Sequence, residues 1–105
     1  MHDMQVIRWQ EANEPQESIL RTRMQQEGLS PHSWSNGPGD TYVVHSHTYE
    51  KVLYCVRDSI RFVMPNAANG ATVDLSPGDC LILPAHTPHS AYVGSRGVTC
   101  IEAAR

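Results

Sequence analysis

The sequence predicts an all-β fold, a sandwich or barrel of short strands with one short helix near the N-terminus. From residue 29 onward, strand-like runs follow one another at regular spacing, and turn residues separate them. The apolar fraction of 40%, with seven glycines and seven prolines, is typical of a globular chain with many turns. We expect one domain over 1–105, with the N-terminal strand and helix at about 4–28 and the barrel at about 29–103.

The N-terminal part is predicted to hold a short strand and then a helix. The apolar run 4–9 is a candidate strand. The pair Glu14–Pro15 opens the helix because proline fits the first helical turn, and Gly28 supplies its left-handed C-cap. A narrow apolar stripe, which predicts a helix lying on a sheet or covering its edge, is formed by Ile19, Leu20 and Met24.

The rest of the chain is a succession of strand-like runs with turns between them. Asn69–Gly70 is a hairpin signal, since both residues tolerate positive φ. The runs cover residues 29–34, 41–47, 51–57, 59–64, 71–75, 80–83, 89–94 and 98–103.

Two of these runs, 52–56 and 81–83, are apolar on both faces of the predicted strand. In a small barrel one face fills the interior, and the other face should meet water. An apolar outer face therefore needs a cover. The sequence favours a second copy of the chain, which gives a homodimer, and the alternative is the N-terminal helix of the same chain.

Four of the six histidines fall in two short segments, His45-Ser-His47 and Pro84-Ala-His86-Thr-Pro-His89. His45 and His47 are two residues apart, so on a strand both side chains point to the same face. A third imidazole from a strand about forty residues later would complete a three-nitrogen metal site with open coordination positions. The expected cofactor is a divalent metal, and imidazole ligands suit Zn, Fe, Mn, Ni, Cu or Co.

Two motifs around these segments make the chain resemble the cupins, in particular small single-domain, RmlC-like (cupin type-2) proteins. The first motif is a glycine, five residues and His-x-His, and here Gly39 precedes His45-Ser-His47 at that spacing. The second is a glycine, five residues and Pro-x-Gly-x-x-His, and here Gly78 precedes Pro84–His89. The resemblance covers about residues 39–93. It implies a cupin-type double-stranded β-helix, a jelly-roll barrel.

The resemblance also implies a ligand set. His45, His47 and His89 fall on the three histidine ligands of the family. The family's carboxylate ligand falls on Lys51, and Glu50 stands one residue earlier. This offset matters because adjacent strand residues face opposite sides of a sheet. Either Glu50 reaches inward from a loop or a bulge, or the metal has three histidines and water.

Three further residues, Lys51, His86 and Tyr49, are candidates for catalysis or substrate binding. An inward Lys51 near a divalent cation costs energy unless an anionic substrate or a nearby carboxylate offsets its charge. It then anchors substrate or acts in acid–base chemistry; the alternative is a head group that reaches solvent at the barrel mouth. His86, at a glycine position of the motif, either faces the substrate or is an exposed loop residue. Tyr49 either donates to a substrate or packs as an amphipathic ring.

Charge and composition exclude several partners. The net charge of −3 and the lack of a Lys/Arg-rich block argue against a nucleic acid or an anionic membrane surface. No apolar run approaches the roughly 20 residues of a membrane span, and the N-terminus lacks the regions of a signal peptide. Cys55, Cys80 and Cys100 are interpreted as small buried hydrophobes in a reducing compartment. We therefore expect a cytoplasmic protein.

The expected function follows from the resemblance. There is no nucleophile elbow and no phosphate-binding loop, which argues against a hydrolase or a nucleotide-binding protein. The resemblance implies a metal-dependent enzyme of the dioxygenase or isomerase class that acts on a small polar or aromatic molecule. The alternative is a non-catalytic module that binds or senses a small ligand, with or without metal. In a third interpretation the histidines are structural and the barrel only assembles.

Overall fold

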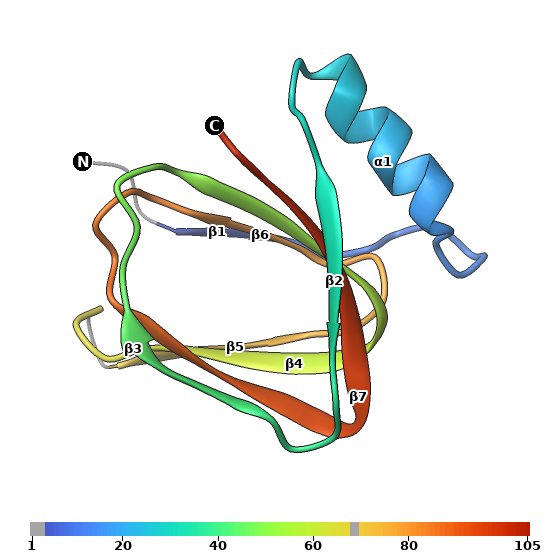
Figure 1. The fold of residues 1–105 in the computed structure, drawn as a ribbon. Coiled ribbons are helices and arrows are strands. Elements are labelled where there is room, and N and C mark those ends of the chain that lie inside the picture. The colour runs from blue at the N-terminus through green and yellow to red at the C-terminus, as the bar shows by residue number, and fades with distance from the viewer. Residues whose placement is uncertain (1–3, 68–69) are drawn as a thin grey trace.

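The described residues form a double-layered β-barrel with one helix on its outer surface (Figure 1). This computed structural model describes residues 4–67 and 70–105. In chain order the elements are β1 (Gln5–Ile7), α1 (Glu17–Gln26), β2 (His32–Asn36), β3 (Thr41–His45), β4 (Lys51–Met64), β5 (Ala71–Leu75), β6 (Cys80–Leu83) and β7 (His89–Ala104). The predicted all-β fold with a short N-terminal helix is confirmed.

Two predictions rest partly on residues outside this description. Asn69 belongs to the predicted hairpin turn, and Met1–Asp3 belong to the N-terminal segment in which no signal peptide was expected. Gly70, the second residue of that turn, is described and has a φ of 59°. In the described part of the chain, no helix has the length and apolar character that crossing a membrane requires.

The long strands β4 and β7 take part in both layers. Residues 51–54 of β4 pair with β6, and residues 60–64 pair with β5. β7 pairs with β3 near its start, with β2 near its end and with β4 along most of its length. One layer therefore has the order β1-β6-β4-β7-β2. In the other layer, β5 pairs with the second half of β4 and β3 pairs with the first half of β7.

Each long strand was predicted as two shorter ones, and this prediction was wrong about where the strands end. The residues expected to separate them bend a continuous strand instead (Figure 1). In β4, the register shifts on both sides of Asp58, which has a φ of 64°; in β7, Gly97 has a φ of 88°. A bulge increases local twist and turns a strand without ending its pairing.

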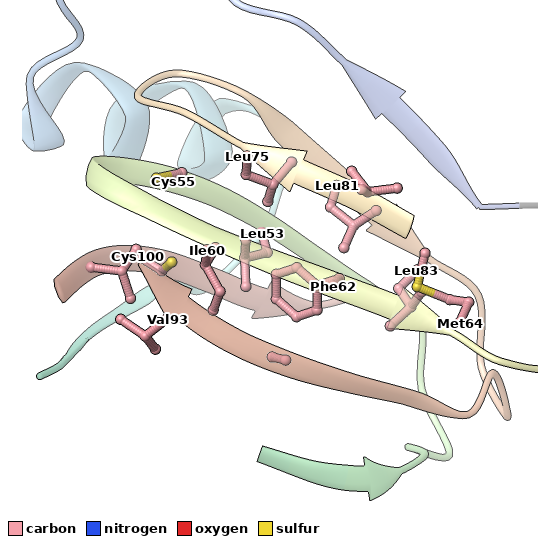
Figure 2. Packing of buried hydrophobic residues seen from close by; sticks show 13 residues of the cluster. Leu53, Cys55, Ile60, Phe62, Met64, Leu75, Leu81, Leu83, Val93 and Cys100 are labelled. Atoms are coloured by element: carbon pink, nitrogen blue, oxygen red, sulfur yellow. The ribbon is translucent and has the colours of Figure 1, made fainter. Parts of the chain in front are cut away.

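The core lies between the two layers. Alternate residues of β4 face it, so Leu53 and Cys55 are interior while Val52 and Val56 lie on the outer face. Figure 2 shows side chains of both layers meeting in this interior, among them Phe62. The three cysteines are buried free thiols, as the sequence predicted.

Helix α1 covers the outer apolar face of β4, β6 and β7. Leu20 and Met24 are each 0% exposed and pack in a cluster with Val52, Ile82 and Ile101. Burying each of these helix side chains contributes roughly 1.5–3 kcal/mol. The third residue of the predicted stripe points away from the sheet and is exposed (Ile19). The apolar outer face is therefore covered within one chain, which was the alternative to a second copy.

The helix ends where the sequence predicted. Gly28 has a φ of 82°, and its N–H donates to the carbonyl oxygen of Gln25 at 3.0 Å. The N–H of Leu29 reaches back to the carbonyl oxygen of Met24, also at 3.0 Å. These two bonds form a Schellman motif, and the accompanying apolar contact is provided by Leu29 and Met24, which share one buried cluster.

Candidate metal centre

Three histidines that are distant in the sequence meet at one place. His45 is the last residue of β3 and pairs in register with His89, the first residue of β7. His47 lies two residues beyond the end of β3. One nitrogen from each of the three lies within 4.8 Å of the others. The structure thus brings together the three histidines that the two motifs single out.

The local backbone places His47 differently from the sequence prediction. The predicted strand 41–47 ends at His45, so strand alternation does not orient His47. Instead, the carbonyl oxygen of His47 accepts a hydrogen bond from the N–H of His86 at 2.7 Å. This bond ties the loop after β3 to the turn before β7, and a register shift between Tyr42 and His45 re-aims the end of β3.

Hydrogen bonds to backbone carbonyls set the tautomers of two of the imidazoles. Nδ1 of His45 lies 2.8 Å from the carbonyl oxygen of Val43, and Nδ1 of His89 lies 2.8 Å from that of Thr87. A carbonyl only accepts, so each Nδ1 carries the hydrogen and each Nε2 keeps a free lone pair. Nε2 of His89, like Nε2 of His47, is buried and has no hydrogen-bond partner among the described residues.

Burial favours the neutral form of His47 and His89. Desolvation lowers the pKa of His89 to about 4, outweighing the hydrogen bond to Thr87, and the neighbouring His45 and Lys51 lower it further. Burial also lowers the pKa of His47, with Lys51 as the next cause. A metal binds the unprotonated nitrogen, so protons do not compete for His47 and His89 at neutral pH.

Glu50 does not join the three histidines. Its carboxylate accepts a hydrogen bond from Nε of Arg105 at 2.7 Å, and its carbonyl oxygen accepts from the N–H of Arg105 at 2.8 Å. Among the described residues, the group of converging ligand atoms consists of the three histidines. Glu50 stands immediately before β4, where no bulge turns its side chain toward them.

Lys51 points inward. Its side chain shares the inner face of β4 with Leu53, and the residue is 8% exposed, so the head group does not reach solvent as one interpretation had it. Its Nζ lies 3.4 Å from Oε2 of Glu102, which is also buried. Oε1 of Glu102 accepts a hydrogen bond from the indole Nε1 of Trp34 at 2.5 Å.

Glu102 and Trp34 were missed by the sequence reasoning. The available signal was Glu102 itself, a single charge within the apolar run 98–103. A charge at an interior position of a strand requires a buried partner, and Lys51 is the only lysine in the chain. Only the pairing of β4 with β7, which sets Leu53 opposite Glu102, shows that the two charges meet.

Tyr49 and His86 lie at the margin of the site. The ring of Tyr49 stacks on that of His47, with centroids 5.0 Å apart and an interplanar angle of 28°. Tyr49 is also partly open to solvent, with 38% of its surface exposed. His86 is exposed in the turn before β7 and has a φ of 62°, which fits its position at a motif glycine.

A cavity of about 270 Å³ opens beside the histidines. Its wall is apolar where Ile60, Phe62 and Ala91 contribute, and polar at two places. One polar place is formed by His45 and His47. The other is formed by Lys51, Glu102 and Trp34, and Tyr42 completes the lining. A volume near the lower end of ligand pockets suits a small molecule.

The donor set fits a divalent transition metal. Three imidazoles with converging nitrogens are ligands for Zn, Cu, Fe or Ni, and the buried, unpartnered Nε2 atoms of His47 and His89 are costly without such a partner. Three protein ligands leave coordination positions free, which is the arrangement of catalytic rather than structural sites.

Comparison with known proteins gives matches in structure only. The sequence matches no protein-family model and no curated protein. A structure of the DMSP lyases RdDddP and RnDddQII has a TM-score of 0.66 and 26% identity, over 73% of this chain and 38% of that chain. An RmlC-like cupin from Shewanella frigidimarina NCIMB 400 has a TM-score of 0.60 and 25% identity, over 72% and 64%. A cupin superfamily protein from Desulfitobacterium hafniense DCB-2 has a TM-score of 0.62 and 12% identity, over 97% and 76%.

These likenesses establish the architecture that the motifs predicted. They do not transfer an activity, because one barrel hosts many reactions and this chain spans 38% of the lyase chain.

Proposed function

We propose that this chain, a cupin in fold, holds one divalent metal ion through His45, His47 and His89 and acts there on a small molecule. The observation that carries the proposal is the convergence of one nitrogen from each of the three imidazoles within 4.8 Å, with Nε2 of His47 and of His89 buried without a partner. The coordination positions not filled by protein are those that a substrate or water takes.

The residues around the triad hold it ready for that role. The carbonyl oxygens of Val43 and Thr87 fix the rings of His45 and His89 through Nδ1. The ring of Tyr49 limits rotation of His47. A bound divalent ion supplies Lewis-acid polarisation of a ligand or, if redox-active, oxygen chemistry. The apolar residues of the cavity wall lower the local dielectric, which strengthens electrostatic contacts beside them.

The class of reaction follows from resemblance and remains a proposal. The family resemblance supports a dioxygenase or an isomerase, and the likeness to a DMSP lyase adds a lyase to these. The cavity favours a small polar or aromatic substrate, because aromatic rings of Trp34, Tyr42 and Phe62 line it next to Lys51 and Glu102. The alternative function, a module that binds or senses such a ligand without turnover, uses the same cavity.

Metal analysis of the protein purified without an affinity tag tests the proposal. We expect about one equivalent of a divalent transition metal per chain. His47→Ala and His89→Ala should each lose it, while His86→Ala, at an exposed histidine outside the triad, should keep it. A metal-free protein that cannot be loaded with zinc, iron or nickel would contradict the proposal. Turnover of a substrate by the loaded protein then separates an enzyme from a binding module.

We further propose that the protein is a cytoplasmic homodimer, with β3 at the contact between the two copies. β3 pairs with β7 on one side, and within residues 4–67 and 70–105 no strand pairs with its other side. Val43 on this strand is 82% exposed, and Val44 is also exposed. A strand edge with exposed branched side chains is a template for pairing with another chain.

A further inference from the structure

The cavity beside the triad has a second polar place, which the metal proposal does not use. It consists of the ammonium of Lys51, the carboxylate of Glu102 and the indole of Trp34. All three side chains line the same cavity as His45 and His47.

The strand pairing explains why these three side chains are interior. Leu53 of β4 lies opposite Glu102 of β7, and Trp34 of β2 lies opposite Cys100. Leu53 and Cys100 are core residues, so Lys51, two positions from Leu53, and Glu102, two positions from Cys100, project to the same inner face. The arrangement is therefore fixed by the barrel and not by flexible loops.

The hydrogen-bonding capacity of this group is not exhausted. An ammonium has three donors, and the carboxylate of Glu102, at 3.4 Å, takes up one direction. Glu102 is already held by Trp34 at its other oxygen. The side chain of Lys51 is only 10% exposed, so its remaining donors face the cavity and not bulk water. Donors that face a small cavity and are shielded from bulk water favour an acceptor that enters the cavity.

We propose that Lys51 binds the carboxylate of a small monoanionic ligand whose other end reaches the histidine triad, and that Glu102 and Trp34 position Lys51 for this. The inference rests on the proposed metal site. A divalent ion on three neutral imidazoles leaves the cavity positively charged, since Lys51 and Glu102 cancel each other. An anion offsets that charge and accepts from the free donors of Lys51.

The same residues argue against a phosphate or a dicarboxylate dianion at this place. Phosphate sites use several cationic donors or a cradle of backbone N–H groups. Here a single lysine serves, no arginine is among the residues that line the cavity, and the negative charge of Glu102 lies next to Lys51. The cavity volume of about 270 Å³ further restricts the ligand to a small molecule.

Zinc-loaded protein and matched thiol probes test the inference by calorimetry. The probes are mercaptoacetate, 3-mercaptopropionate and 4-mercaptobutyrate, whose thiolates bind zinc while their carboxylates extend toward Lys51 at graded lengths. Each is compared with its neutral amide. We expect the best acid to bind at least about tenfold tighter than its amide, the size expected of a hydrogen bond to a buried charge. The indole N–H resonance of Trp34 should shift on binding, with Trp9, outside the cavity, as internal control.

Two variants should move binding in opposite directions. Lys51→Met should remove the preference for the acid, while Glu102→Gln, which keeps a hydrogen-bond acceptor for Trp34 but removes the competing negative charge, should tighten acid binding. If the ion pair were purely structural, the two variants would either both weaken acid binding or both leave it unchanged. Lys51→Met leaves the buried carboxylate of Glu102 unpaired, which destabilises the fold. The double variant Lys51→Met/Glu102→Gln buries no unpaired charge and tests the same loss of the lysine in a folded protein. It should bind acid and amide equally.

The outcomes separate the two proposals. If zinc does not bind, the metal site and this inference both fall. If zinc and thiols bind but wild-type protein does not prefer the acid, or the double variant keeps the preference, the anion site alone is overturned. If inorganic phosphate displaces the best acid more strongly than acetate does, the proposed class of ligand is wrong.

Discussion

Asp58 and His86 are described residues with positive φ that are not glycine, at 64° and 62°. In the motifs by which the chain resembles the cupins, His86 takes the place of the glycine in Pro-x-Gly-x-x-His, and Asp58 takes the place of the glycine with which the first motif ends. Aspartate and histidine are among the side chains that tolerate the left-handed region best, so the backbone requirement survives the loss of glycine. At Asp58 this conformation belongs to the bend of β4, and at His86 to the turn that anchors His47.

The bend at Asp58 allows a test at a single residue. Asp58→Gly should leave the free energy of unfolding unchanged or raise it by up to about 1 kcal/mol, since glycine removes the steric cost but gains freedom when unfolded. Asp58→Val should lower it by about 1–2 kcal/mol, because a β-branched side chain fits this φ worst. Urea unfolding measures both. Arg57→Val, at the exposed neighbour with ordinary φ, is the control. Equal effects of Gly and Val would contradict the strain argument.

At the scale of elements, the turn before β6 holds the N-terminal segment on the barrel. The carboxylate of Asp79 accepts hydrogen bonds from the N–H of Trp9 at 3.0 Å, the N–H of Ser76 at 2.9 Å and the guanidinium of Arg8 at 2.9 Å. Burial raises the pKa of Asp79, but these three donors outweigh it and the pKa lies below its usual value. One side chain thus joins the segment after β1 to the connection between β5 and β6.

Replacing this carboxylate should make stability depend less on pH. A group whose pKa is lower in the folded state stabilises the fold above its unfolded pKa, about 3.9, and loses that contribution as the pH falls through the folded value. Asp79→Asn should therefore lower the free energy of unfolding by about 2 kcal/mol at pH 7 and by less below about pH 4. Urea unfolding at the two pH values measures the difference.

Asp74→Asn is the matched control, because Asp74 pairs with Arg61 on the surface, where an ion pair contributes little. An Asp79→Asn loss that is the same at both pH values would show that the effect is not electrostatic.

The whole molecule is a barrel whose outer apolar face is closed by its own helix, so the case for a dimer now rests on β3 alone. The molecule measures 34 × 32 × 22 Å along its principal axes. The exposed valines of β3 lie on the strand that ends in His45, so an interface there would border the candidate metal centre.

Light scattering at micromolar concentration tests the homodimer. We expect twice the chain mass of 11.7 kDa, and the monomer mass for Val43→Lys, because a lysine at an exposed edge blocks pairing. Thr72→Lys, at an exposed position of β5, should stay dimeric. The monomer mass for the wild-type protein would refute the dimer.

Most of the fold was predictable because it depends on local signals. Strand alternation, the glycine at the helix C-cap and the turn residues each act over a few positions, and the structure follows them. The prediction failed at the corners of β4 and β7, because a bulge and a turn have similar sequences and only pairing with neighbouring strands distinguishes them.

By itself, the sequence determined the barrel, the helix and the three histidines, since spacing along a strand and two short motifs specify them. Only the tertiary structure decided what surrounds those histidines. In the fold, Glu50 pairs with Arg105, and Lys51 pairs with Glu102 from a strand far away in the sequence. Helix α1 covers the outer face. The physical reason is that a buried charge is placed by the partner it finds, and that partner is chosen by strand register.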